Sequence, residues 1–169
     1  MTDRTSEPPD WALWFYWIMA TTLGWILGSL FFTALPMAFS GVAIAGLQWA
    51  ILYKRIHQSW RWAILSAASW IAGYILFILF IPPGAGFLLG PLMGTILGIL
   101  QWFLLRQEFE WAGWWIPISI LAWTTGLTVA PGLLTSGALP GALTGLALVI
   151  LFRYSSRGGL NRPSSQSGL

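Results

Sequence analysis

Apolar residues dominate six long stretches of the chain, and short polar or turn-forming segments separate them. Each stretch is close to the length of about 20 residues that a helix needs to cross the hydrocarbon core of a membrane. No Asp, Glu, Lys, Arg or His lies between the ends of any stretch. The pattern predicts transmembrane helices at Trp11–Phe32, Leu35–Tyr53, Trp62–Ile81, Phe87–Leu105, Trp111–Ala130 and Leu133–Phe152.

Composition agrees with a membrane rather than water as the solvent. Of the 169 residues, 57% are apolar and 8% are charged, and the mean hydropathy is +0.73. A soluble domain carries about 25% charged residues, so this chain has too few to cover a soluble surface. The composition excludes a soluble enzyme, a nucleic-acid reader and a disordered chain. The absence of cysteine also excludes disulfides and thiolate metal sites.

The cationic residues set the expected orientation. Six spans place both ends of the chain on the same side of the membrane, and all 8 Lys and Arg residues fall on that side. The positive-inside rule then puts both termini in the cytoplasm. We expect an all-α polytopic membrane protein with a cytoplasmic N-terminal segment over residues 1–10, a transmembrane domain over 11–152 and a disordered cytoplasmic tail over 153–169.

Self-comparison reveals a repeated unit of two helices. The sequence Leu47-Gln48-Trp49 recurs as Leu100-Gln101-Trp102, and the odd-numbered spans share a W-x3-[ST]-x3-W-x2-G pattern that begins at Trp17, Trp62 and Trp115. We therefore expect three tandem hairpins over residues 11–53, 62–105 and 111–152, related by an axis along the membrane normal. The third copy is degenerate, because Leu148-Val149 replace Gln-Trp.

The combination of G…LQW followed by W…W..G resembles uncharacterised multi-pass membrane proteins that are frequent in cyanobacterial genomes. The resemblance covers roughly residues 11–152, and its motifs are structural rather than catalytic. It implies a protein of the plasma or thylakoid membrane, and it implies no activity or cofactor.

Small residues recur at every fourth position of the fourth and sixth spans, as in a glycine zipper. In lipid, such residues let helix backbones approach closely. We expect helix packing at Gly24, Gly28, Gly41, Gly73, Gly86, Gly90, Gly94, Gly98, Gly126, Gly137, Gly141 and Gly145. The four glycines of the fourth span exceed what one neighbour in a small bundle needs. We therefore expect this face to bind a partner, either a larger membrane complex or a second copy of the chain.

Two glutamines and three tryptophans are the candidate site residues. Gln48 and Gln101 are the strongly polar side chains within the spans, and each either forms an interhelical hydrogen bond or holds a ligand carbonyl or headgroup. An anchoring belt at the membrane interface accounts for most of the 13 tryptophans. Trp25, Trp70 and Trp123 lie deeper. They either pack on glycine faces or line a pocket for a flat apolar ligand such as a quinone, carotenoid or chlorin.

The predicted spans lack the charged and histidine side chains that catalysis or ion coupling within a membrane would use. No Asp, Glu, Lys, Arg or His lies within a span, whereas ion-coupled carriers usually keep a carboxylate, histidine or cation there, and an intramembrane enzyme needs a titratable or nucleophilic group at depth. His57, Glu108 and Glu110 fall in loops, where we expect them to be solvated. We expect an integral membrane protein of structural, assembly or lipid- or pigment-binding type without catalytic activity, with membrane lipid and not nucleic acid as a partner. The alternative is a passive channel or facilitator for a small neutral solute, with Gln48 and Gln101 at its cytoplasmic mouth.

Overall fold

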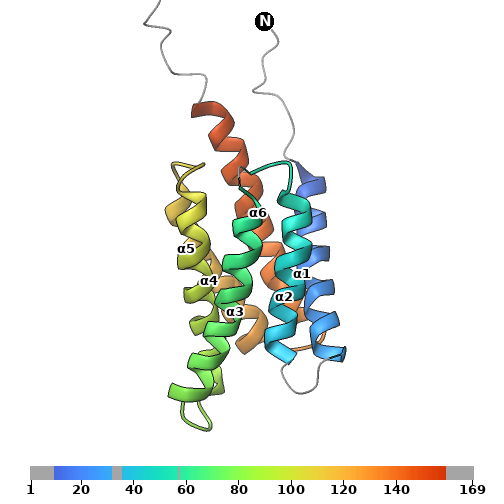
Figure 1. Ribbon diagram of the computed structural model, residues 1–169, viewed down its shortest axis with the longest axis vertical. Coiled ribbons are helices and arrows are strands. Elements are labelled where there is room, and N and C mark those ends of the chain that lie inside the picture. Colours follow the sequence, from blue (N-terminus) through green and yellow to red (C-terminus); the bar gives the residue numbers. More distant parts are fainter. Residues whose placement is uncertain (1–9, 32–35, 57, 159–169) are drawn as a thin grey trace, which may run out of the picture.

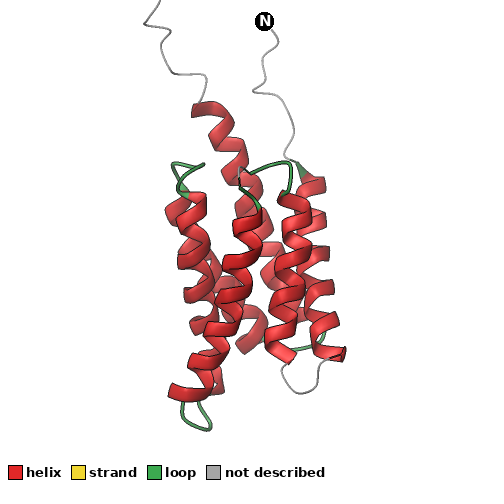
Figure 2. Ribbon diagram, viewed as in Figure 1, coloured by secondary structure: helices red, strands yellow, loops and turns green. Residues whose placement is uncertain are grey.

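The computed structural model describes residues 10–31, 36–56 and 58–158, and within these ranges every regular element is helical (Figure 2). The α-helices of this part are α1 (Trp11–Phe31), α2 (Pro36–Leu52), α3 (Trp60–Phe80), α4 (Leu89–Leu105), α5 (Trp115–Thr124) and α6 (Thr135–Gly158). The expected all-α class is confirmed. His57 and the turn at residues 33–34 lie outside the described residues.

Four helical segments of the described chain are long and apolar enough to cross a membrane, at Trp11–Leu30, Trp60–Phe80, Gly86–Leu105 and Thr135–Tyr154. The apolar part of α2, Met37–Leu52, is shorter. Helix α5 is also short, because a 3-10 turn (Ala112–Trp114) precedes it and a π-helix (Thr125–Val129) continues it. Membrane-crossing length is therefore present in four of the six expected segments.

The six helices pack as a ring in chain order. Each helix contacts the one before it and the one after it, and α6 packs against α1 to close the ring. The start of α1 and the end of α6 lie at one end of the bundle, beside the loops that follow α2 and α4 (Figure 1). We call this the terminal end and the opposite one the hairpin end. Buried residues from all six helices therefore meet around a common centre.

Helix α6 is longer than the sequence pattern indicates. We expected a disordered tail from residue 153, but the helix continues through Arg153 and Tyr154 to Gly158. The helix therefore extends over the first six residues of the segment that we assigned to the tail. Loss of hydropathy ends a membrane span but does not end a helix, and no proline interrupts the backbone hydrogen bonds before glycine, a poor helix former, is reached. Residues 1–9 and 159–169 lie outside the described residues.

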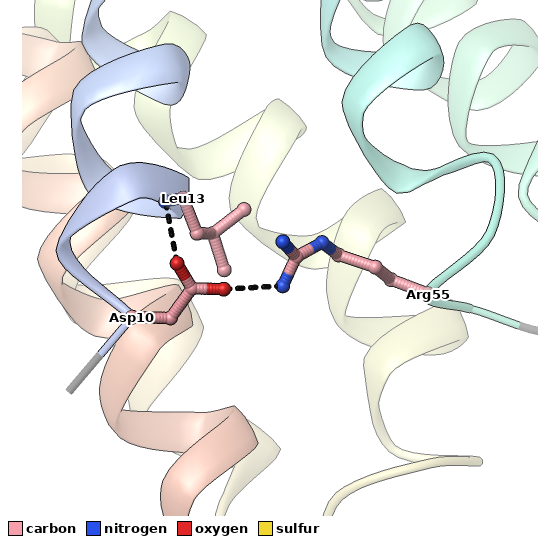
Figure 3. A network of polar contacts seen from close by, with 3 residues as sticks. All are labelled: Asp10, Leu13 and Arg55. Atoms are coloured by element: carbon pink, nitrogen blue, oxygen red, sulfur yellow. Dashed lines mark hydrogen bonds and ion pairs between the residues drawn. The ribbon is translucent and has the colours of Figure 1, made fainter. Parts of the chain in front are cut away.

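Asp10 caps α1 and ties it to the loop after α2 (Figure 3). The backbone N–H of Leu13 donates to Oδ1 of Asp10 at 2.9 Å, and Nη1 of Arg55 donates to Oδ2 at 2.6 Å. A carboxylate at this position satisfies a free N–H of the first turn and opposes the positive end of the helix dipole. Burial disfavours the charged form of Asp10, but the hydrogen bonds from Leu13 and Arg55 outweigh it and hold the pKa of the carboxyl below its ordinary value.

The core falls into two clusters of buried side chains. The larger lies toward the terminal end and includes Trp17, Trp62, Trp115 and Leu148, all of which are at most 1% exposed. The smaller lies deeper and includes Ile44, Trp70, Met93 and Trp123. A band of buried polar side chains accompanies the larger cluster, and it is the most distinctive feature of the structure.

Candidate functional site

Gln48 links three helices through the two ends of its carboxamide. Its Nε2 donates to Oγ1 of Thr21 on α1 at 3.0 Å, and its Oε1 accepts from Nε1 of Trp62 on α3 at 3.2 Å. The hydroxyl of Thr21 in turn donates to the carbonyl of Trp17 at 2.8 Å. Gln48 is only 4% exposed, so these bonds replace the water that its amide would otherwise require.

Gln101 forms the corresponding contacts one hairpin further along the chain. Its Nε2 donates to Oγ of Ser66 on α3 at 2.8 Å, and its Oε1 accepts from Nε1 of Trp115 on α5 at 3.0 Å. Interhelical bonds of this kind contribute about 0.6 kcal/mol each in membrane proteins and at most about 1.7. The contacts of Gln48 and Gln101 therefore support the interhelical interpretation of both residues rather than ligand binding.

The pattern of hydrogen bonds that Gln48 and Gln101 form is not repeated between α5 and α6. Leu148 stands where a third glutamine would be, and its side chain is fully buried. Ser119 corresponds in the repeat to Thr21 and Ser66, and its buried hydroxyl has no hydrogen-bond partner among the described residues. Trp17 donates instead to Oγ1 of Thr144, one helical turn before Leu148, at 3.0 Å.

We call this band of buried hydrogen bonds the polar layer, formed by Trp17, Thr21, Gln48, Trp62, Ser66, Gln101, Trp115 and Thr144. Its side-chain bonds cross five of the six contacts between neighbouring helices: α1–α2, α2–α3, α3–α4, α4–α5 and α6–α1. Within the described residues, the α5–α6 contact alone has no side-chain bond in this layer. The two helices of the third hairpin are therefore held together there by apolar contacts only.

The tryptophans fill the centre of the ring. Near the terminal end, the Trp62 ring lies edge-on to Trp17 and Trp115, with centroids 5.7 and 5.8 Å apart. Deeper in the bundle, Trp70 lies 6.2 Å from Trp25 and 4.8 Å from Trp123.

The cavity lined by these central residues is small. It has a volume of about 10 Å³, which is room for about one water molecule. Trp70 thus packs against both Trp25 and Trp123, and the cavity beside Trp70 and Trp123 is too small for a flat ligand. Trp70 also packs on a glycine, because a Cβ at Gly41 would lie only 2.0 Å from its Cγ.

The glycines of α4 and α6 face helices of the same chain. A Cβ at Gly90 would lie 2.6 Å from Cα of Thr124 on α5, and one at Gly94 would lie 2.6 Å from Cα of Ile120. On α6, a Cβ at Gly137 would lie 2.6 Å from Cα of Thr22 on α1. Gly98 also faces α5, and Gly141 and Gly145 also face α1. We expected the glycine face of the fourth span to bind an external partner, but α5 covers it.

The remaining predicted packing glycines also lie against neighbouring helices, with one exception. Gly24 and Gly28 face α2, Gly73 faces Met93 on α4, and Gly126 faces Pro140 on α6. Gly86 lies in the 3-10 turn before α4, and nothing approaches the position of its Cβ within 4 Å. Gly86 is therefore the one predicted packing glycine that the described structure leaves without a close neighbour.

A groove of ligand size lies between α5 and α6, near the terminal end. Its volume is about 350 Å³, within the range of about 300–1,000 Å³ that is typical of ligand sites. The groove is almost wholly apolar, and the side chains that line it are Trp111, Trp114, Trp115, Ile118, Ala147, Ile150, Leu151 and Tyr154. Two of them, Trp111 and Trp114, are more than 60% exposed.

The sequence carries a signal for this groove that we did not use. The motif Leu-Gln-Trp of the first two repeats becomes Ala147-Leu148-Val149 in the third. With Leu148 in place of glutamine, the described parts of α5 and α6 share no side-chain bond in the polar layer, and Ala147 in place of leucine gives the wall of the groove less side-chain volume. Both changes loosen the same contact.

The described residues hold no group of three or more His, Asp and Glu side chains that could bind a metal ion. Glu108 and Glu110 lie in the loop between α4 and the 3-10 turn at Ala112, and neither lines the groove. Comparison of the chain with protein-family models, with curated proteins and with solved structures finds no match.

Proposed function

We propose that this chain is a non-catalytic integral membrane protein that binds a membrane lipid in the groove between α5 and α6. In this proposal all six helices cross the membrane as three hairpins, both termini are cytoplasmic, and the membrane is the plasma or the thylakoid membrane. The observation that carries the proposal is the 350 Å³ apolar groove beside the one helix contact that lacks a bond in the polar layer.

The position and lining of the groove support a lipid as its occupant. Trp111, Trp114 and Tyr154 lie near the terminal end, where the proposed topology places the boundary between headgroups and acyl chains. Indole and phenol rings favour that depth in a bilayer. Ile118 and Ala147 line the deeper part, where only apolar groups would be met. A groove that is aromatic at the rim and aliphatic below matches the change in polarity along a lipid molecule.

The centre of the ring supports neither a solute pathway nor a pigment site. The central cavity of about 10 Å³ is far smaller than a quinone or a chlorin. The carboxamides of Gln48 and Gln101, which a channel would use at its mouth, bond to protein groups at both ends. Lipid binding at the side of the bundle therefore has more support than passive transport through its centre.

Filling the groove tests the proposal. Ile150 lines the groove and is 45% exposed, so Ile150→Trp adds a ring at its mouth without entering the core. We expect this variant to bind dioleoylphosphatidylglycerol about tenfold more weakly in native mass spectrometry of delipidated protein, which corresponds to roughly 1.4 kcal/mol. Ile71→Trp is the matched control, because Ile71 is 43% exposed on α3 and lies outside the groove. Equal affinity in both variants and the wild type would contradict the proposal.

A further inference from the structure

We infer that the lipid in this groove is held through the ester carbonyls of its acyl chains, which accept hydrogen bonds from the indole N–H groups of Trp111 and Trp114. The headgroup then contributes little to recognition. The inference rests on the proposed lipid binding and adds the chemical group that the site recognises.

Two indole N–H donors at the rim are available to a ligand. Four other tryptophans bond within the protein: Trp14 to the carbonyl of Ala142, and Trp17, Trp62 and Trp115 to side chains of the polar layer. The indole N–H of Trp111 or Trp114 donates to no acceptor among the described residues. Both rings line the groove, so a molecule that occupies it would lie against them.

The depth of the groove indicates which part of a lipid fits. On α6 the lining runs from Ala147 to Tyr154, which is about 10 Å at the helical rise of roughly 1.5 Å per residue. The hydrocarbon core of one leaflet is about 15 Å thick, half of roughly 30 Å. The groove thus accommodates the upper part of an acyl chain. This placement brings the ester linkage, rather than the headgroup, to the level of the indole rim.

The charge of the lining agrees with this assignment. No Lys, Arg, Asp or Glu is among the residues that line the groove. A site that selects an anionic headgroup usually presents basic side chains to it. Neutral N–H donors at an apolar groove instead suit a neutral acceptor, and the ester carbonyl is the acceptor at that depth of a diacyl lipid.

A comparison of ester and ether lipids tests the inference. Dioleoylphosphatidylglycerol and its di-O-oleyl ether analogue share headgroup and chain length, but the ether lacks both carbonyls. By native mass spectrometry of the delipidated full chain, we expect the ester lipid to bind about three- to tenfold more tightly than the ether lipid. A difference of this size corresponds to one or two neutral hydrogen bonds. The double substitution Trp111→Phe and Trp114→Phe keeps an aromatic ring at each position and removes both N–H groups, so it should abolish this preference.

Controls distinguish the two levels of the proposal. Trp60→Phe alters another tryptophan of the terminal end, 54% exposed and outside the groove, and should preserve the ester preference. Equal binding of ester and ether lipids by the wild type would overturn the inference and leave lipid binding standing. Binding of neither lipid would overturn both. A preference for phosphatidylglycerol over phosphatidylcholine that is independent of the linkage would also overturn the inference, because the headgroup would then be the recognised part.

Discussion

Trp17 donates its indole N–H to Oγ1 of Thr144 at 3.0 Å, across a separation of 127 residues in the chain. This bond joins the first helix to the last and closes the polar layer on the side where no glutamine is available. Trp62 and Trp115 use Gln48 and Gln101 as acceptors for the same purpose. The acceptor differs, but each of these tryptophans fastens its helix to the helix before it in the ring.

Restoring the missing glutamine should stabilise the third hairpin. In Leu148→Gln the new carboxamide lies where Gln48 and Gln101 lie in their hairpins, so we expect it to bond to the free hydroxyl of Ser119. The expected gain is about 0.6 kcal/mol in the free energy of unfolding, measured in mild detergent by denaturant titration. The control is the same substitution in a Ser119→Ala background, where the amide has no acceptor and stability should fall. A gain of equal size in both backgrounds would contradict the predicted bond.

Removing an existing glutamine should have the opposite effect. Gln101→Leu leaves the buried N–H of Trp115 and the hydroxyl of Ser66 without their partner. Because orphaned buried polar groups cost about 1–3 kcal/mol, we expect Gln101→Leu to lower the free energy of unfolding by about that amount. Adding Trp115→Phe should recover part of the loss, since it removes one orphaned donor. An unchanged melting temperature in Gln101→Leu would show that the polar layer contributes nothing to stability.

Gly86 and Gly94 should differ sharply in their tolerance of a side chain. Gly94→Leu would place a Cβ 2.6 Å from Cα of Ile120, so α4 and α5 would have to separate. Overpacking of this kind costs about 1–3 kcal/mol or more, and we expect a lower melting temperature. Gly86→Leu, where nothing lies within 4 Å, should leave it unchanged. If Gly94→Leu instead folds normally and loses only a bound partner, our original expectation of an external glycine interface would be restored.

The contact between Asp10 and Arg55 should make stability depend on pH. The pKa of Asp10 is lowered in the folded state, so its contribution is present above the unfolded pKa and is lost as the pH falls through the folded value. We expect the stability difference between the wild type and Asp10→Asn to be largest near about pH 7 and to shrink as the pH falls below the ordinary Asp pKa of about 3.9. Asparagine is also a good N-cap, so the comparison isolates the charge. A difference that is independent of pH would mean that the carboxylate charge plays no part.

The packing side of each glycine-bearing helix could be identified from the sequence, but the helix that covers it could not. Spacing places Gly90, Gly94 and Gly98 on one face, and that face does pack closely. Spacing does not reveal which helix lies opposite, because the order of helices around a ring is set by contacts between segments distant in the chain. The expectation that this face is free for an external partner rested on spacing alone, and α5 covers the face at Gly90, Gly94 and Gly98.

The polar layer was anticipated only in part, because Thr144 was not among the residues that the sequence analysis singled out. The repeat singled out Gln48 and Gln101, yet the acceptor role of each toward the next hairpin's tryptophan requires knowing how the hairpins lie together. The groove was missed altogether, because it depends on the distance between α5 and α6. The comparison of the Leu-Gln-Trp motifs identified Leu148, but it did not include Ala147, the residue at the position of leucine that lines the groove.

The free hydroxyl of Ser119 has a consequence for how the molecule meets its surroundings. If every contact between neighbouring helices had the same side-chain hydrogen bonds, all sides of the ring would be equivalent. The α5–α6 contact, which lacks a bond in the polar layer among the described residues, makes one side of this ring different from the others, and the groove opens on that side. If a lipid binds in the groove as proposed, it would enter and leave on this side of the ring only, and a neighbouring protein on the same side would compete with it.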